Sequence, residues 1–271
     1  MPIMLACAGL ASRADFRHME GTGTAASRLL SVLSVFTGQR PALTLTEIAT
    51  TTALPLSTAH RLVGELVTWG ALERGSDGRY RIGLRLWELG SLAPRGLPLR
   101  EAALPYLEDL YEATHENVQL SVLDGDEVVF VERLSGRQAV KTRTRVGGRL
   151  SSIATAGGRV LLANAPAEVL DKVLTEPVVP YTPETITDPA ILRKLLIDIK
   201  RQGVAVDQNQ VTNGAIAIGA PIRNRYAEVV AAVSVVAKAE PGAARLLTPL
   251  VTTTASAVSR TLGYKGKRRR S

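Results

Sequence analysis

The first third of the chain repeats its apolar residues with the period of an α-helix in three successive segments. In residues 25–37 one helical face carries Leu29, Val32, Leu33 and Phe36. Thr44 to Glu47 has the Thr-x-x-Glu form of a capping box, which predicts the start of a second, short helix. Residues 56–69 then resume the helical period, and their inward positions are Ala59, Leu62, Val63 and Leu66.

A hairpin pattern follows the three helices. Residues 72–82 alternate around a Gly-Ser-Asp-Gly turn signal. The two faces of the predicted hairpin carry Tyr80 and Ile82 on one side, and Arg79 and Arg81 on the other. Three helices followed by a hairpin is the order of elements in a winged helix-turn-helix, so we expect such a domain over residues 24–83.

The next helical pattern, over residues 83–93, is apolar on every side instead of along one stripe. Its apolar residues are Leu84, Leu86, Trp87, Leu89 and Leu92. A helix of this kind has to be covered all round, which predicts a linker packed between a domain and a partner. Because Pro94 to Pro98 marks a domain boundary, we assign the linker helix to residues 84–98.

Residues 99–264 mix helical and strand patterns. Helices are predicted at 99–114, at 155–163, from Asp188 onward, and at about 243–262. Strands are predicted at 118–123, 127–134, 139–146, 204–207, 215–222 and 229–237. This succession predicts an α+β domain, with a largely antiparallel sheet that carries helices on its faces.

Composition and charge change this picture little. The 271 residues are 45% apolar, enough for a packed core, and carry a net charge of +8. Five of the basic residues lie in the basic tail, residues 265–271, so the net charge alone is weak evidence for a DNA-binding surface. We interpret residues 1–23 as a flexible leader, with a signal peptide as the disfavoured alternative and Met19 as a candidate start.

Few residues suggest catalysis or a metal. The single cysteine, Cys7, cannot form an intramolecular disulfide, and no run of about 18 apolar residues predicts a membrane span, so we expect a cytoplasmic protein. The three histidines, His18, His60 and His115, lack the spacing of a zinc site. The chain has no Gly-x-Ser-x-Gly elbow, P-loop or metalloprotease His pair, so we expect no enzyme activity, cofactor or metal.

Residues 56–69 form the candidate recognition helix, because the second helix of the motif lies in the major groove of DNA. On a helical wheel the outward positions are Ser57, Arg61, Gly64 and Thr68, and the flanking positions are Thr58 and His60. Such side chains donate to phosphates or base edges, although a merely solvated face would have the same composition. The candidate DNA-binding residues are Thr44, Ser57, Thr58, His60, Arg61, Arg79 and Arg81.

Three features of the second domain allow two interpretations each. The Gly-Gly pair before Arg159 could cradle an anion at a helix start, but such glycines more often allow close packing. Asp207 follows a strand, where a carboxylate is most often a solvated turn residue. We favour a charge-guarded sheet edge or an assembly surface over an anion site for the basic face of residues 139–146, namely Lys141, Arg143 and Arg145.

Short motifs in unbroken order over residues 25–263 resemble the IclR family of bacterial transcriptional regulators. They are LPLSTAHRL (54–62), DGRYRIG (77–83), LWELG (86–90), RVGGRL (145–150), ATAGG (154–158), YTPETITDP (181–189), GVAVD (203–207) and VSV (233–235). The resemblance implies a winged helix-turn-helix, a linker helix, and a GAF-like domain for a small organic effector, in a homodimer or homotetramer. It also implies an effector pocket lined by Leu150, Ala156, Gly157, Asp207, Ala217 and Ser234, which shifts the balance for Asp207 toward a pocket role.

Several positions depart from the family's usual residues. Ala217 stands where many members have a cysteine, Val236 where a second serine often follows, and Ile153 where a histidine is common. Residues 208–210 replace a more acidic run. Each change removes a hydrogen-bonding or charged group, and the polar atoms of a buried ligand need partners. We therefore expect an effector larger or less polar than a two- or three-carbon keto acid, such as an aromatic or carboxylate compound.

The sequence thus predicts a sequence-specific DNA-binding transcriptional regulator, more in keeping with a repressor, that responds to a small metabolite. One alternative is a ligand-binding sensor or enzyme domain whose winged helix docks protein; it requires a nucleophile or metal set near Asp207. Another is a structural DNA-binding protein without a ligand, which requires a filled second domain with no cavity.

Overall fold

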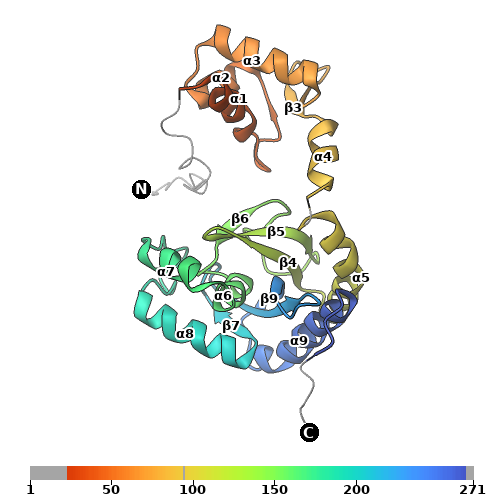
Figure 1. Cartoon of the computed structure of the whole chain (residues 1–271), viewed down its shortest axis with the longest axis vertical. Helices are drawn as coiled ribbons and strands as arrows, with labels where there is room; N and C mark the ends of the chain where they lie inside the picture. The colour runs from red at the N-terminus through yellow and green to blue at the C-terminus, as the bar shows by residue number, and fades with distance from the viewer. Residues whose placement is uncertain (1–22, 94, 267–271) are drawn as a thin grey trace, which may run out of the picture. The chain divides into compact units, whose positions relative to one another are not determined.

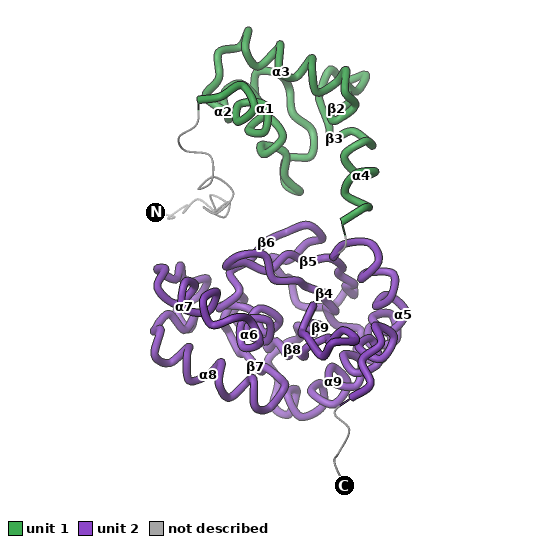
Figure 2. The backbone as a smooth tube through the Cα atoms, viewed as in Figure 1, with its two compact units in different colours: residues 1–93 green, residues 94–271 purple. Residues whose placement is uncertain are grey.

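The computed structural model describes residues 23–93 and 95–266, which divide into two compact units, residues 1–93 and 94–271 (Figures 1 and 2). The proposed leader lies almost wholly outside the described residues, as does most of the basic tail. Each unit has its own hydrophobic core, so each is described by itself.

Unit 1 is the expected winged helix-turn-helix. Its helices are α1 (Ala25–Ser34), α2 (Leu45–Thr52), α3 (Leu56–Trp69) and α4 (Leu84–Ser91). A three-stranded antiparallel sheet has the order β1-β3-β2, from strands β1 (Ala42–Leu43), β2 (Leu72–Arg74) and β3 (Tyr80–Ile82). The predicted capping box starts α2: the Thr44 hydroxyl accepts from Glu47 N at 3.2 Å, and Thr44 N donates to Glu47 Oε2 at 2.7 Å.

Two details of unit 1 differ from the sequence prediction. Strand β1 was not predicted, because two residues are too few to show a period of alternation. Tyr80 and Ile82 were expected to share one face of the hairpin, but Tyr80 is buried and Ile82 is 44% exposed. The core is formed instead by residues of the helices and of the other strands, including Val32, Leu43, Ile48, Leu62, Val63, Leu66 and Leu72.

Helix α4 confirms the predicted apolar helix after the hairpin. It is anchored to unit 1, since Leu84 N donates to Glu73 Oε1 at 3.0 Å and the Arg85 guanidinium stacks over the Trp69 ring at 4.4 Å. Four of its apolar side chains, or those just after it, are more than half exposed: Leu84, Trp87, Leu89 and Leu92. The helix ends earlier than expected, and Leu97 already begins the next one.

Unit 2 is built on one antiparallel six-stranded sheet of order β6-β5-β4-β9-β8-β7 (Figure 1). The strands are β4 (Asn117–Asp124), β5 (Glu127–Leu134), β6 (Arg149–Ser151), β7 (Ala205–Gln208), β8 (Ala215–Arg223) and β9 (Val229–Lys238). Helices α5 (Leu97–Thr114) and α9 (Ala243–Thr261) pack on one face. The other face carries α6 (Ala156–Ala163), α7 (Ala167–Thr175) and α8 (Pro189–Gln202).

Residues 139–146 correct one prediction: they form no strand. Their alternation of β-branched and basic residues is typical of an edge strand, but the segment runs as a loop between β5 and β6. Side chains of β4 hold the loop, because Asn117 Nδ2 donates to Val140 O at 2.8 Å and Gln119 Nε2 donates to Thr144 Oγ1 at 2.9 Å. The short strand β6 and helix α7 were not predicted.

Candidate functional site

The outward face of α3 carries the side chains that the helical wheel placed there. Ser57, His60 and Arg61 are exposed, and Thr58 is half-buried. Gly64 is also exposed, and a Cβ at this position would meet no atom within 4 Å. This face therefore offers short polar groups, a cation and a point of close approach, which are the groups that a recognition helix presents to DNA.

The N-terminus of α3 is open to an anion. Pro55 occupies the N-cap position and makes no side-chain cap hydrogen bond. The first backbone N–H groups of the helix therefore lack a capping side chain, and they point toward the end where the helix dipole is positive. Ser57 and Thr58 lie in this first turn, so backbone and hydroxyl donors together can bind a phosphate.

The three candidate DNA-binding arginines of unit 1 have acidic partners within the unit. Arg61 pairs with Glu65 on α3 at 2.5 Å, and Arg79 pairs with Glu47 at 3.0 Å. These pairs are exposed, so a DNA phosphate can exchange with the carboxylates at small energetic cost. The hydroxyl of Thr44 is engaged in the capping box, so Thr44 is positioned by the helix start and offers less to a ligand.

The wing carries a further ion pair between Arg81 and Asp77. Arg81 Nη2 lies 2.6 Å from Asp77 Oδ2, and the hydrogen bond from Arg81 lowers the pKa of Asp77 to about 2. The pair joins the turn of the hairpin to strand β3. The structure thus leaves Ser57, Thr58, His60, Arg61, Arg79 and Arg81 on or near the surface of unit 1, and their contact with DNA stays a prediction.

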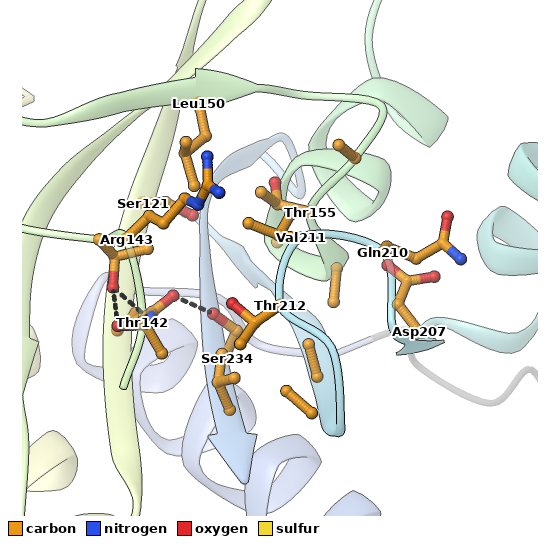
Figure 3. Close-up of a pocket in the computed structure, with 18 of the residues that line it drawn as sticks. Ser121, Thr142, Arg143, Leu150, Thr155, Asp207, Gln210, Val211, Thr212 and Ser234 are labelled. Carbon is orange, nitrogen blue, oxygen red and sulfur yellow. Dashed lines mark hydrogen bonds between the residues drawn. The ribbon is translucent and has the colours of Figure 1, made fainter. Parts of the chain in front are cut away.

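Unit 2 contains a cavity of about 50 Å³ between the sheet and the start of α6 (Figure 3). Strand register builds its floor: Gln119 of β4 lies opposite Ser234 of β9, which lies opposite Gly219 of β8. In the adjacent row, Val236 pairs with Ala217, and Ala217 pairs with Asp207. Side chains of alternate residues point to one face, so these two rows bring small and polar groups together under α6.

Glycines let the start of α6 approach this floor. Thr155 caps the helix by accepting a hydrogen bond from Gly158 N at 3.1 Å. A Cβ at Gly157 would lie 2.8 Å from Ser121 Oγ, and a Cβ at Gly219 would lie 2.7 Å from the backbone carbon of Ala156. The Gly-Gly pair therefore has the packing role that the sequence favoured, and it also places the positive end of the helix at the cavity.

A buried ion pair holds one wall of the cavity, which Asp207 and Gln210 line. The guanidinium of Arg159 donates to Asp207 Oδ1, to Ile153 O at 2.6 Å and to Gln210 Oε1 at 2.7 Å. Burial raises the pKa of Asp207 to about 6, and the positive charge of Arg159 opposes the rise. Asp207 therefore lies buried at the cavity, and its interpretation as a solvated turn residue is wrong. With a pKa of about 6 its carboxyl group is ionised at neutral pH.

Two buried oxygens at the cavity have no hydrogen-bond partner among the residues that the structure describes. They are Asp207 Oδ2 and Ser121 Oγ. Buried polar atoms without a partner are rare in folded proteins, because each costs about 1–3 kcal/mol. A ligand with polar atoms at both positions would remove this cost.

The cavity brings together all six residues that the resemblance assigned to the pocket: Leu150, Ala156, Gly157, Asp207, Ala217 and Ser234. That these residues bind an effector stays a prediction. Sequence reasoning missed further lining residues, among them Gln119, Ser121, Phe130, Thr142, Arg143, Thr144, Thr155, Gln210 and Thr212. Alternation within β4 could have indicated Gln119 and Ser121, whereas for Arg143 the sequence favoured a sheet edge or an assembly surface over an anion site.

Other kinds of site find little support in the part of the chain that the structure describes. Within residues 23–93 and 95–266, no group of three or more His, Cys, Asp or Glu side chains is placed to hold a metal ion. Among the helices of these residues, none combines the length and hydrophobicity needed to cross a bilayer.

Comparison with known proteins agrees with both units. Residues 25–76 match the IclR helix-turn-helix domain, and residues 93–260 match the bacterial transcriptional regulator IclR C-terminal domain. The chain is 32% identical to the HTH-type transcriptional regulator KipR of Bacillus subtilis over 250 residues, which are 91% of this chain and all of KipR. It is 31% identical to the HTH-type transcriptional regulator XynR of Escherichia coli, over 76% of this chain and 83% of XynR.

A solved structure is similar over both units. It is the crystal structure of an IclR homolog from Microbacterium hydrocarbonoxydans complexed with 4-hydroxybenzoate, with a TM-score of 0.84 and 39% identity over 89% of this chain and 99% of that one. A winged helix-turn-helix joined to a sheet domain of the IclR C-terminal type defines a ligand-controlled, DNA-binding regulator of transcription. Within that class, the chain belongs to the IclR family of bacterial transcriptional regulators.

Proposed function

We propose that the protein is a transcriptional repressor that releases its operator when an aromatic carboxylic acid binds in the cavity of unit 2. The observation that carries the proposal is that cavity, in which two buried oxygens lack partners and all six expected effector residues meet. The exposed polar face of α3 supplies the DNA-binding surface. The buried carboxylate of Asp207 is held by Arg159, which favours ligand binding over a catalytic step.

The cavity walls support an aromatic effector. Phe130, Leu150 and Val236 supply apolar surface, whereas Asp207 and Ser121 supply the unpaired polar atoms. A pocket with mostly apolar walls and a few placed polar groups suits a ring with polar substituents at its edge. The similar regulator from Microbacterium hydrocarbonoxydans was crystallised with 4-hydroxybenzoate, a molecule of this class, so we adopt 4-hydroxybenzoate as the first compound to test.

The cavity has to widen to admit a ring. Its volume is about 50 Å³. An engineered protein cavity that binds benzene has a volume of about 150 Å³. The loop of residues 139–146 is the part of the lining that can move most easily, because side-chain hydrogen bonds from Asn117 and Gln119 hold it instead of a strand ladder.

The exposed side chains of α4 support assembly into a homodimer or homotetramer. Leu84, Trp87, Leu89 and Leu92 form an apolar surface on a helix that adjoins the DNA-binding unit. Exposed apolar patches of this kind are typical of protein–protein contacts. A second copy that packs on α4 would pair two recognition helices, as a palindromic operator requires, and such a regulator would act in the cytoplasm, where the DNA is.

The coupling between effector and operator needs only a modest energy. A tenfold loss of operator affinity corresponds to about 1.4 kcal/mol of difference in effector affinity between the DNA-binding and DNA-free arrangements. One widened cavity per subunit can supply this amount, provided that the widened form is disfavoured in the DNA-bound assembly.

Fluorescence anisotropy tests the proposal directly. The protein is titrated onto labelled DNA from upstream of its own gene, and onto scrambled DNA of equal length, at about 150 mM salt, where nonspecific attraction is weak. We expect preference for the upstream DNA, and a loss of binding on addition of 4-hydroxybenzoate but not of glyoxylate. If the protein prefers the upstream DNA but no aromatic acid changes this binding, the proposed effector class is wrong. The same holds if glyoxylate alone changes the binding.

A further inference from the structure

The basic loop of residues 139–146 reaches the pocket through three consecutive residues, one of which is charged. Thr142, Arg143 and Thr144 line the cavity, whereas Lys141 and Arg145 do not. Figure 3 shows the Arg143 side chain directed toward Leu150 and Ser121, with Asp207 and Gln210 at the opposite side of the pocket. Of the three cations that the sequence pattern put on one face, the structure thus brings only Arg143 to the pocket.

A chain of hydrogen bonds holds the two threonines that flank Arg143. Ser234 Oγ donates to Gln119 Oε1 at 3.4 Å, and Gln119 Nε2 donates to Thr144 Oγ1 at 2.9 Å. The hydroxyl groups of Thr144 and Thr142 lie 2.7 Å apart. The residues on both sides of Arg143 are therefore tied to the sheet floor, which leaves the arginine side chain pointing over the cavity.

Two charged side chains of the described residues line the pocket, of which one is paired within the protein and one is available to a ligand. Asp207 contributes the negative charge, and the buried guanidinium of Arg159 neutralises it. Arg143 contributes the positive charge and has no hydrogen-bond or ion-pair partner among the described residues. The start of α6 adds the positive end of a helix dipole beside Ser121. The positive charge of Arg143 is therefore the unpaired charge among the described lining residues, and the pocket can bind one anionic group beside it.

We propose that Arg143 binds the carboxylate of the effector and that Asp207 Oδ2, across the pocket, accepts a hydrogen bond from a hydroxyl at the effector's other end. This inference rests on the proposed function. It adds the orientation of the effector in the pocket and identifies Arg143 as the residue that selects an anionic ligand. The planar guanidinium suits a carboxylate because it can donate two parallel hydrogen bonds. Lys141 and Arg145, which are exposed on the same loop, raise the local concentration of anions.

The test compares two ligands that differ by one charge, 4-hydroxybenzoate and its neutral amide, 4-hydroxybenzamide, by isothermal titration calorimetry on the full chain. Arg143→Gln removes the proposed partner, and Arg143→Lys keeps the charge without the fork. Arg145→Gln is the matched control, because it removes an arginine from the same loop but outside the lining. Both substituted positions are exposed, so the variants are expected to fold.

We expect Arg143→Gln to weaken 4-hydroxybenzoate binding by about ten- to hundredfold and 4-hydroxybenzamide binding by less than about threefold. Arg145→Gln should keep the preference for the acid, and Arg143→Lys should keep part of it. If the wild-type protein binds acid and amide equally, or if Arg143→Gln keeps the preference, the inference is wrong while the proposed function stands. If no aromatic acid binds the wild-type protein, the proposed effector class fails and this inference fails with it.

Discussion

Arg159 and Asp207 form an ion pair whose side chains are only 1% and 3% exposed, and Asp207 also lines the cavity of unit 2. The pair joins α6, whose first turn faces the cavity, to β7 at the edge of the sheet. Arg159 also holds Gln210 and the carbonyl of Ile153, so one side chain fixes three segments around the pocket. Asp207 thus has a structural task beside any contact with an effector.

The two tasks can be separated by stability measurements. Asp207→Ala leaves a buried guanidinium without its counterion, which we expect to cost about 3–5 kcal/mol of the stability of unit 2. The double variant Asp207→Leu with Arg159→Met removes both charges and should recover most of the loss. Urea unfolding followed by far-UV circular dichroism measures the effect.

Tryptophan fluorescence supplies an internal control for this experiment. Both tryptophans of the chain, Trp69 and Trp87, lie in unit 1, so their transition should stay where it is in the wild-type protein. An Asp207→Ala protein as stable as the wild type would contradict the role assigned to the pair.

The raised pKa of Asp207 predicts how ligand preference depends on pH. Above its pKa of about 6, Asp207 is ionised and Oδ2 accepts a hydrogen bond from a ligand hydroxyl. Below that pH the carboxyl binds a proton, and Oδ2 receives it because Oδ1 is occupied by Arg159. The ratio of 4-hydroxybenzoate affinity to benzoate affinity should therefore fall between about pH 7.5 and about pH 5.

Benzoate is the control in this titration, because it lacks the hydroxyl group but keeps the carboxylate. The carboxylate is common to the two ligands, so any change at that end of the pocket affects both affinities and cancels in their ratio. Calorimetry with both ligands at each pH measures the ratio. A ratio that is constant, or that rises as the pH falls, would exclude Asp207 as the acceptor.

Two glycines at the pocket should respond differently to the same added methyl group. At Gly219 the new Cβ would meet the backbone of Ala156 at 2.7 Å and that of Gly157 at 2.9 Å, so Gly219→Ala should destabilise unit 2 by about 1–3 kcal/mol. At Gly157 the close contact is the Ser121 hydroxyl, a side chain that can turn away.

Gly157→Ala should therefore keep the fold, and the better helix propensity of alanine offsets part of the strain. The added methyl group points toward Ser121, Ala232 and Ser234 and so narrows the cavity. We expect weaker binding of 4-hydroxybenzoate with a melting temperature close to that of the wild type. Equal loss of stability in the two variants, measured by thermal unfolding, would contradict the difference between the two glycines.

Local sequence signals predicted most of the elements, because the information lies within a few residues. The period of residues 56–69 gives the bounds of α3, and Asp188 caps α8 as its Asp-Pro start indicates. The winged helix-turn-helix followed from the order of such elements alone. The six pocket residues came from the family resemblance and not from any local pattern.

The parts that could not be predicted depend on contacts between distant segments. Residues 139–146 have the local pattern of a strand, but Asn117 and Gln119 of β4 hold them over the pocket as a loop. Arg159 follows a Gly-Gly pair, and its partner Asp207 lies 48 residues further on, so neither residue alone reveals a buried pair. Both features require knowledge of the strand order, which no periodicity within one segment contains.

Arg61 provides the sharpest test of the DNA-binding surface. It is exposed on α3 and pairs with Glu65, one helical turn away, at 2.5 Å. Arg61→Ala should weaken operator binding by about 1–3 kcal/mol, because a phosphate or base contact is lost. Arg201→Ala is the matched control: it removes another exposed, ion-paired arginine, from α8 of unit 2, and we expect operator affinity to stay at the wild-type value.

The kind of contact can be read from the salt and sequence dependence of the Arg61→Ala protein. If Arg61 binds a phosphate, operator and scrambled DNA should weaken alike, and the slope of affinity against salt should fall by about one. If Arg61 reads a base, the operator alone should weaken. Glu65→Gln should strengthen binding in either case, because it releases Arg61 and removes a negative charge from the helix face. Unchanged operator binding by Arg61→Ala would show that α3 meets DNA through its other exposed residues or not at all.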